Sequence, residues 1–286
     1  MKAREFAQHA FAILMRGLAG SRADMNCFVD LFAPDARLWL PATPNTRSPY
    51  VGDAAIRSLL VDFVPALYRD GLHMKLYHAL ESDARVLFQF QDYGVRQDGS
   101  EYHNSPCIAL GVANDQITGF WEYWGGPQFF EACFDGSGAG PGANVDTQAQ
   151  AIAELAFCDL QRGLTGDAAA MESFLARLAD DVRLWFPPTP NTHSPYTGRA
   201  AAAKLFRELL LPMYPQGLFT RRFHTLAGGS RRAFEMQSFG VRADRSEYIN
   251  SPCLCIDIKQ HKIAALWEHW GGPGCFDPNL RAIFTT

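Results

Sequence analysis

The chain has 286 residues, of which 48% are hydrophobic and 20% are charged, and its formal net charge at pH 7 is −4. This composition is typical of a globular protein, and the lack of a Lys/Arg-rich run argues against nucleic acid as a partner. The longest apolar stretches are shorter than the roughly 20 residues that cross a bilayer, so no membrane partner is expected.

The first half begins with two predicted helices. Apolar residues at helical spacing mark them, with Phe6, Ala10, Phe11, Leu14 and Leu18 on the first and Met25, Phe28, Val29 and Phe32 on the second. Residues 37–40 are predicted to form a strand that ends at a proline-rich loop, residues 41–49. A third helix starts near Gly52-Asp53, and its apolar face carries Ile56, Leu59, Leu60, Phe63 and Leu67.

From residue 74 onward the apolar pattern changes to a period of two. Four strands are predicted, at residues 74–80, 85–93, 102–112 and 117–124. The dipeptides Asp98-Gly99 and Asn114-Asp115 are typical of the short turns between antiparallel strands. Helices followed by an antiparallel sheet predict the α+β class.

The second half of the chain repeats the first, with an offset of 146 positions between residues 39 and 185. Residues 43–52 return as 189–198, residues 100–107 as 246–253, and residues 121–127 as 267–273. Solenoid repeats span roughly 20–50 residues, so a repeat of this length is a whole domain. We expect two tandem domains, residues 1–133 and 151–286, joined by a Gly-rich linker at residues 134–150.

The last predicted strand of the repeat is aromatic on both faces, because side chains alternate along a strand. Phe120, Glu122 and Trp124 point one way, and Trp121 and Tyr123 point the other. Helices can cover one face, and a second sheet can cover the other. We therefore predict that the domains pair sheet to sheet as an internal pseudo-dimer through Trp121, Tyr123, Trp267 and His269. Further assembly into a homo-oligomer is left open.

The seven cysteines favour reduced thiols. Only Cys107 and Cys253 occupy equivalent positions, whereas a disulfide framework would have been copied with the domain. Cys253 and Cys255 have no histidine nearby, so no metal is expected. Residues 1–6 contain no signal-peptide hydrophobic region, and a cytoplasmic location is expected.

A run Leu-Phe-Ala-Pro-Asp-Ala at residues 31–36 leads into the first Trp strand, followed by the proline-rich loop, a long helix and the four strands. With this order each repeat resembles the nuclear transport factor 2-like superfamily, which includes the SnoaL-like polyketide cyclases. Residues 101–104 and 122–124 look like the ending of these proteins, and the phenazine-biosynthesis condensing proteins end similarly. The resemblance covers nearly the full length of both repeats.

The resemblance implies a cystatin-like α+β barrel: a cone of helices on a curved antiparallel sheet, with a pocket at its mouth. The superfamily contains isomerases, cyclases, dehydratases, epoxide hydrolases and non-catalytic proteins, so the fold alone does not give the function. The last-strand glutamate that is catalytic in some relatives matches Glu122 and Glu268. The chain departs from the pattern at Trp121 and Trp267, where relatives often carry Arg, and in Gly-Gly-Pro, where they often carry Asp-Pro.

Glu122 and Glu268 are the main candidates for catalysis. Each lies between apolar neighbours, which disfavour its charged form and raise its pKa towards neutrality. The alternative is a structural glutamate bonded to backbone or to a tryptophan N–H.

Other pairs retained in both repeats are weaker candidates. His78 and His224 could act as acid–base partners of the glutamates, or could be core histidines. Asn104 and Asn250 could orient a substrate oxygen, or could belong to a turn. The remaining candidates for substrate binding are Tyr102, Tyr248, Trp39, Trp185, Trp124, Trp270, Asn45 and Asn191.

These residues favour a cofactor-independent acid–base enzyme. It would cyclise, isomerise or dehydrate a small carbonyl-containing metabolite in a biosynthetic pathway. The alternatives are a non-catalytic protein that binds a small molecule in two aromatic pockets and, less favoured, a scaffold. Both repeats keep the candidate residues, so two competent pockets are expected, with ligand preference adjusted by Tyr123 against His269 and His103 against Ile249.

Overall fold

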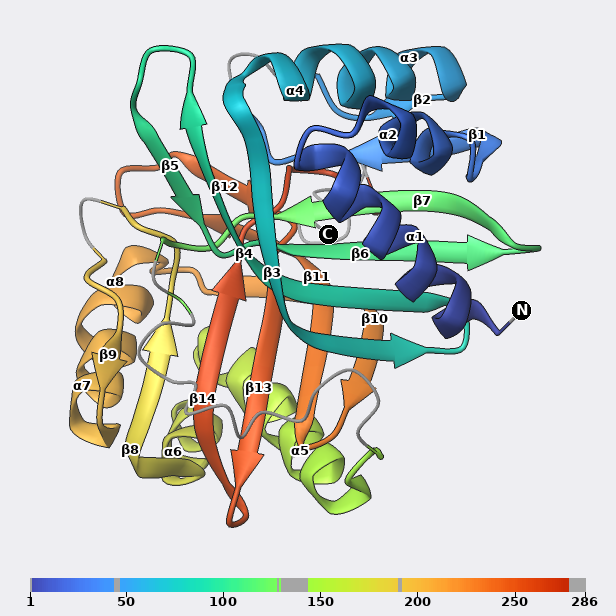
Figure 1. Cartoon of the computed structure of the whole chain (residues 1–286). Coiled ribbons are helices and arrows are strands. Elements are labelled where there is room, and N and C mark those ends of the chain that lie inside the picture. The colour runs from blue at the N-terminus through green and yellow to red at the C-terminus, as the bar shows by residue number, and fades with distance from the viewer. Residues whose placement is uncertain (1, 44–46, 128, 130–143, 190–191, 278–286) are drawn as a thin grey trace. The chain divides into compact units, whose positions relative to one another are not determined.

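The computed structural model describes residues 2–43, 47–127, 129, 144–189 and 192–277 (Figure 1). The chain divides into two compact units, Met1–Pro141 and Gly142–Thr286. Most of the predicted linker, residues 134–143, lies outside the described residues. Its last four residues form the first turn of helix α5 (Thr147–Leu164).

Unit 1 begins with its helices. Helices α1 (Ala3–Leu18) and α2 (Arg22–Val29) precede strands β1 (Phe32–Trp39) and β2 (Tyr50–Val51). A continuous helical segment follows, made of α3 (Asp53–Arg57), the π-helical turn η1 (Ser58–Phe63) and α4 (Val64–Ala66).

The sheet of unit 1 follows the helices in sequence. It contains β3 (Tyr68–Ser82), β4 (Arg85–Arg96), β5 (Glu101–Asn104), β6 (Cys107–Ala113) and β7 (Gln116–Tyr123). The strand order is β2-β1-β7-β6-β4-β3, with β5 paired to β4. Strand β1 runs parallel to β7, and the other pairs in unit 1 are antiparallel.

Unit 2 repeats this order element by element. Its first elements are α5, α6 (Ala168–Ala176), β8 (Leu178–Trp185), β9 (Tyr196–Thr197), α7 (Arg199–Lys204), η2 (Leu205–Leu210) and α8 (Leu211–Met213). Its remaining strands are β10 (Leu218–Gly228), β11 (Arg231–Val241), β12 (Glu247–Asn250), β13 (Cys253–Lys259) and β14 (Lys262–His269). The predicted fold class, two tandem domains of helices on an antiparallel sheet, is confirmed.

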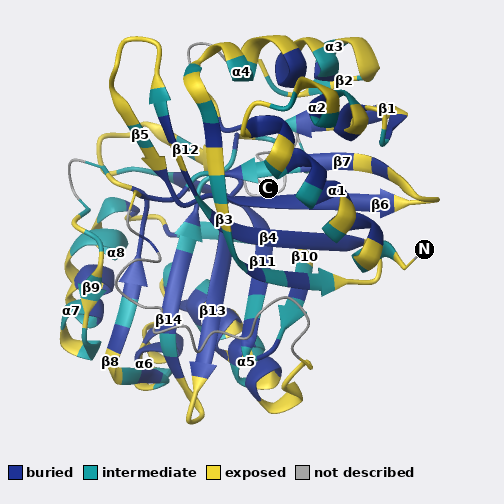
Figure 2. Cartoon of the chain, in the orientation of Figure 1, coloured by how far each residue is buried: buried dark blue, intermediate teal, exposed yellow. Residues whose placement is uncertain are grey.

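The first helix of each unit packs on the inner face of its own sheet. Phe11 of α1 stacks on Phe88 of β4 with ring centroids 4.2 Å apart, and Phe157 of α5 stacks on Phe234 of β11 at 4.1 Å. Strands β4 and β6 are buried along most of their length (Figure 2). This stacking defines the helix-covered face of each sheet.

The two opening helices of each unit approach closely at a glycine. A Cβ atom on Gly17 would lie 2.9 Å from the Cα atom of Met25, and one on Gly163 would lie 2.9 Å from that of Met171. Real Cβ atoms essentially never come so close to another heavy atom. The same contact in both units explains why the repeat keeps glycine here.

Two local predictions differ from the structure. The strand expected at residues 102–112 is two strands, β5 and β6, separated at Ser105-Pro106, because proline cannot donate a hydrogen bond to a sheet. Phe63 and Leu67 are 40% and 39% exposed, although the helical pattern placed them on the apolar face. The π-helical turn η1 contains more residues per turn than an α-helix, so it rotates the residues that follow away from the core.

Within the described ranges, no helix is both long and apolar enough to cross a membrane.

Candidate functional site

Strand register places both glutamates on the helix-covered face. Glu268 of β14 pairs with Leu254 of β13, and Leu254 pairs with Phe234 of β11. Directly opposed residues share a face, so Glu268 lies on the side of the sheet that α5 covers. Glu122 follows the same path in unit 1, through Ile108 to Phe88.

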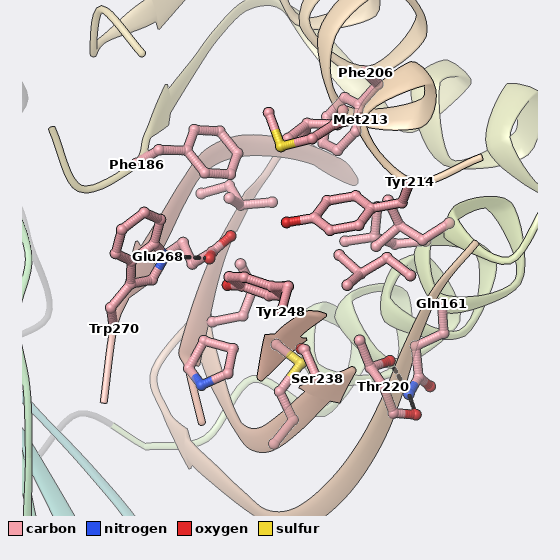
Figure 3. Close-up of a pocket in the computed structure, with 18 of the residues that line it drawn as sticks. Gln161, Phe186, Phe206, Met213, Tyr214, Thr220, Ser238, Tyr248, Glu268 and Trp270 are labelled. Carbon is pink, nitrogen blue, oxygen red and sulfur yellow. Dashed lines mark hydrogen bonds between the residues drawn. The ribbon is translucent and has the colours of Figure 1, made fainter. Parts of the chain in front are cut away.

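Unit 2 contains a cavity of about 240 Å³ on this face, lined by side chains of the helices and the sheet (Figure 3). Its apolar wall includes Phe157, Phe186, Phe206, Met213, Met236 and Leu266. Glu268, Trp270, Tyr214, Tyr248, Ser238 and Arg242 supply polar groups. A mostly apolar wall with a few polar groups is typical of a small-molecule site, and drug-sized ligands use cavities of roughly 300–1,000 Å³.

The carboxyl group of Glu268 lies at one side of the cavity (Figure 3). The Nε1 atom of Trp270 donates a hydrogen bond to Oε1 of Glu268 at 2.6 Å. Burial raises the pKa of Glu268 to about 7, although the bond from Trp270 acts in the opposite direction. A group with this pKa has both its acid and its base forms populated near neutral pH.

Unit 1 repeats this arrangement. The Nε1 atom of Trp124 donates to Oε1 of Glu122 at 2.8 Å, and burial again raises the pKa of the carboxyl to about 7. Two independent copies of one hydrogen bond show that the tryptophan fixes the orientation of the carboxyl.

A tyrosine hydroxyl beside each glutamate is oriented by an asparagine. In unit 2 the backbone N–H of Ser251 donates to Oδ1 of Asn250 at 2.9 Å, and Nδ2 of Asn250 donates to the Tyr248 hydroxyl at 3.1 Å. Because the amide oxygen already accepts the backbone N–H, the amide nitrogen must face the phenol oxygen. The hydroxyl hydrogen of Tyr248 is therefore directed elsewhere. The same two bonds, at 2.9 and 3.1 Å, join Ser105, Asn104 and Tyr102.

Tyr248 is a neutral hydrogen-bond donor at physiological pH. Burial raises its pKa, and the negative charge of Glu268 raises it further. This electrostatic coupling indicates that the phenol and the carboxyl are close neighbours in the cavity. In unit 1, burial and the charges of Asp92 and Glu122 raise the pKa of Tyr102 in the same way.

A second tyrosine and an arginine complete the polar side of the cavity. Tyr214 packs with its ring centroid 5.5 Å from that of Tyr248, and its hydroxyl points into the cavity (Figure 3). The guanidinium of Arg242 lies over the Tyr248 ring at 5.1 Å, and its bond to the Tyr214 phenol opposes the rise in pKa that burial causes. The cavity thus has a carboxyl, two phenols and one cation.

The predicted histidines do not belong to this site. His78 pairs with Gln89 and His224 with Glu235, and these partners alternate with the core residues Phe88 and Phe234. Both histidines therefore face the side of the sheet opposite the glutamates. The structure therefore does not bring the histidine and the glutamate of a unit together on one face, as the expected acid–base partnership needs.

The first tryptophan of each repeat also faces away from the cavity. Trp39 stacks on Trp121 at 5.1 Å and Trp185 on Trp267 at 5.2 Å. The expected role of Trp39 and Trp185 in substrate binding is therefore not supported, and the next residue, Phe186, lines the cavity of unit 2 instead. Trp124 and Trp270 contact the glutamates as described above. The other two candidates, Asn45 and Asn191, lie outside the described residues.

Sequence reasoning missed three positions. Tyr68 and Tyr214, and Arg96 and Arg242, are equivalent pairs that the repeat itself could have revealed. The third position differs between the units, with Asp92 in unit 1 and Ser238 in unit 2. Ser238 lines the cavity of unit 2, and Asp92 is a buried carboxyl that interacts with Glu122.

Within the described part of the chain, no three His, Cys, Asp or Glu side chains are grouped so that they could hold a metal ion.

No protein-family model matches the sequence, and no curated protein matches it either. Solved structures do match. An NTF2-like protein from Anabaena variabilis is 24% identical, with 42% of this chain and 87% of that chain covered and a TM-score of 0.39. A Mycobacterium tuberculosis protein in complex with estradiol-17β-hemisuccinate is 16% identical, with 42% and 93% covered and a TM-score of 0.36.

A third match is a Catenulispora acidiphila protein with a ketosteroid isomerase-like fold, in complex with trimethylamine. It is 15% identical, with 40% of this chain and 83% of that chain covered and a TM-score of 0.35. Each alignment covers less than half of this chain and most of the other.

Proposed function

We propose that the protein is a cofactor-independent acid–base enzyme that acts on a small, mostly apolar metabolite with a carbonyl group. One observation carries the proposal: a glutamate with a pKa of about 7 lies in an apolar cavity, oriented by a tryptophan and next to a neutral tyrosine. Cyclisation, isomerisation and dehydration all begin with such a proton transfer at carbon.

The roles of the groups follow from their hydrogen bonds. Trp270 occupies Oε1 of Glu268, so Oε2 is the oxygen that would accept a proton from the carbon next to the carbonyl. The electrons of that C–H bond would form the C=C bond of an enolate, and the carbonyl oxygen would take up the negative charge. The Tyr248 hydroxyl would donate to this oxygen, because Asn250 already occupies its lone pair.

The protonated Glu268 would then return the proton. Delivery to a different carbon gives an isomer, whereas loss of a hydroxyl group as water gives a dehydration product. Attack of the enolate carbon on a second carbonyl gives a ring. The apolar wall supports each outcome, since it keeps the carboxyl pKa near neutrality and excludes bulk water.

Proton exchange at carbon tests the proposal without knowledge of the substrate. A panel of small cyclic ketones and 1,3-diketones is incubated with the protein in D₂O, and loss of the proton signal next to the carbonyl is followed by NMR. The protein should accelerate exchange of at least one probe. The double variant Glu122→Gln/Glu268→Gln should lose at least about 100-fold of that acceleration.

The alternative is a binding protein with two aromatic pockets that leaves its ligand unchanged, and the apolar wall of the cavity fits this too. Tryptophan fluorescence reports binding of the same ketones, because Trp270 lines the cavity. Binding without exchange for every ketone of the panel would favour the carrier and contradict the enzyme.

A further inference from the structure

Asp92 distinguishes the pocket of unit 1 from that of unit 2. It follows Phe88 and Phe90 on β4 at a spacing of two, so it shares their helix-covered face. It pairs with Met74 on one side and Asn104 on the other, and only 5% of its surface is exposed. Its equivalent, Ser238, lines the cavity of unit 2, so the Asp92 carboxyl occupies the corresponding place in unit 1.

One oxygen of this carboxyl has no partner among the described residues. Oδ1 of Asp92 is buried and makes no hydrogen bond, while the backbone of Asp92 and Asn104 bonds to the carboxyl. A buried polar atom without a hydrogen-bond partner destabilises the folded protein. A ligand that brings a hydrogen-bond donor would remove this cost.

A second carboxyl faces the same place, because in unit 2 the equivalents of Asp92 and Glu122, which are Ser238 and Glu268, line one cavity. Burial and the charge of Glu122 raise the pKa of Asp92 well above its ordinary value. Burial and the charges of the same two acids raise the pKa of Tyr68 to about 12, and its equivalent Tyr214 lines the cavity of unit 2 too. Two neighbouring carboxyls in an apolar site repel each other when ionised, and a cation between them relieves the repulsion, whereas a neutral ligand does not.

We propose that unit 1 contains a binding site for a protonated amine, held by Asp92 and Glu122, which unit 2 lacks because Ser238 stands in place of Asp92. The amine N–H groups donate to Oδ1 of Asp92 and to Oε2 of Glu122, the oxygen that Trp124 leaves free. Arg96 does not distinguish the units, because its equivalent Arg242 occupies the same place over a tyrosine ring.

Asp92 is also one of the residues around a surface hollow of about 320 Å³, together with Met74, Gln91, Tyr93 and Asn104. The titratable groups His73, Lys75 and His103 line it too, and they alternate to the other face of their strands from Asp92. Lys75 places its ammonium over the Tyr77 ring at 5.2 Å. The charged groups of the hollow therefore lie on the face of the sheet opposite the Asp92 carboxyl.

Matched probes test the site. ¹⁹F NMR measures binding of 4-fluorobenzylamine, which is protonated at neutral pH, and of 4-fluorobenzyl alcohol, a neutral molecule of nearly the same shape. We expect one amine per chain, bound at least about tenfold more tightly than the alcohol, since bonds to charged groups are roughly twice as strong as neutral ones. This experiment does not depend on turnover, so it can succeed or fail independently of the proposed enzyme activity.

Two reciprocal variants locate the site. Asp92→Ser gives unit 1 the residue of unit 2 and should remove the preference for the amine, while its melting temperature shows that it is folded. Ser238→Asp should add a second amine site, in unit 2. Equal binding of amine and alcohol, no amine binding, or an amine affinity unchanged in Asp92→Ser would each overturn the proposal.

Discussion

Burial of the two glutamates lowers the stability of the folded protein at the pH values at which their carboxyl groups are ionised. Their pKa is about 7 in the fold, against an ordinary value of 4.5. Between these two pH values the folded state holds protons that the unfolded state has released. Stability contributed by the neutral carboxyl is therefore fully present below pH 4.5, falls as pH rises to about 7, and stays low above it.

Replacement of Glu268 by glutamine should remove the contribution of this residue to the pH dependence of stability. Glutamine keeps an oxygen that accepts the bond from Trp270 but cannot ionise. We expect Glu268→Gln to be more stable than the wild type at pH 8, by up to about 3 kcal/mol, and nearly equal to it at pH 4.5. Urea unfolding of both proteins at the two pH values measures this. A variant that is less stable at pH 8 would show that the carboxylate is held by favourable bonds instead.

We expect the asparagines to act through the tyrosines that they bond to, and not directly on a ligand. Asn250→Leu removes the donor that fixes the Tyr248 hydroxyl, so its hydrogen is no longer directed into the cavity. We expect ketone exchange to fall about tenfold, the equivalent of one neutral hydrogen bond. The measurement uses a Glu122→Gln background, in which only unit 2 reports.

Non-additivity distinguishes this positioning role from loss of structure. If Asn250 acts only through Tyr248, Asn250→Leu should lower the rate no further once Tyr248→Phe is present. Additive losses of rate in the two variants, or an unchanged rate in Asn250→Leu, would exclude a role of Asn250 through Tyr248.

At the level of elements, the sequence predicted the helices and the longer strands in their chain order, because each carries a clear apolar period, whereas the two-residue strands β2 and β9 are too short to show one. It placed the glutamates correctly for the same reason, since alternation on the last strand puts Glu122 with Phe120. The sequence could not give the face of the histidines, because the register shifts between Leu76 and His78, and a bulge of one residue moves a side chain to the other face. Trp39 was expected in the pocket but faces away from it, because nothing in the sequence of a single strand shows which of its two faces lines a pocket.

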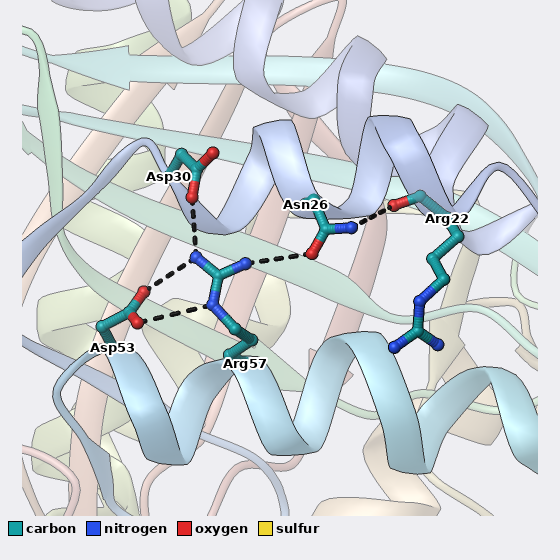
Figure 4. Close-up of polar contacts among 5 residues, drawn as sticks. All are labelled: Arg22, Asn26, Asp30, Asp53 and Arg57. Atoms are coloured by element: carbon teal, nitrogen blue, oxygen red, sulfur yellow. Dashed lines mark hydrogen bonds and ion pairs between the residues drawn. The ribbon is translucent and has the colours of Figure 1, made fainter.

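One arginine contact between helices is made differently in the two units. Arg57 of α3 bonds to Asp30 at 2.6 Å and to Asn26 at 3.0 Å, both at α2, and also to Asp53 at 3.1 Å (Figure 4). Its equivalent in unit 2 is Ala203. Unit 2 joins the corresponding helices through a different pair, Arg207 of η2 and Glu172 of α6, whose nearest atoms are 2.5 Å apart.

This network should stabilise unit 1 modestly. The Arg57 side chain is one-third exposed, so Arg57→Met should cost only about 1 kcal/mol, and less at high salt. Arg22, whose pair with Asp62 is more exposed, is the matched control, and Arg22→Met should cost less than about 0.5 kcal/mol. Thermal unfolding at low and high salt measures both. Equal losses would show that the extra partners of Arg57 add nothing.

For the whole molecule, the duplication raises the question of how many sites work. Both units keep the glutamate, its tryptophan and the tyrosine–asparagine relay, with nearly the same distances. A pocket without a function would be free to lose one of these, since most substitutions outside the core are tolerated. The pairing of the two units through their tryptophan faces stays a prediction.

We therefore predict two working pockets. Glu122→Gln and Glu268→Gln are made separately, and ketone exchange is measured for each and for the double variant. If both sites work, each single variant keeps a substantial part of the rate, and the two remaining rates sum to that of the wild type. The fractions need not be equal, because Asp92 and Ser238 give the pockets different polarity. If one substitution removes all exchange and the other none, the chain has one active unit, and the retained residues of the other serve its stability.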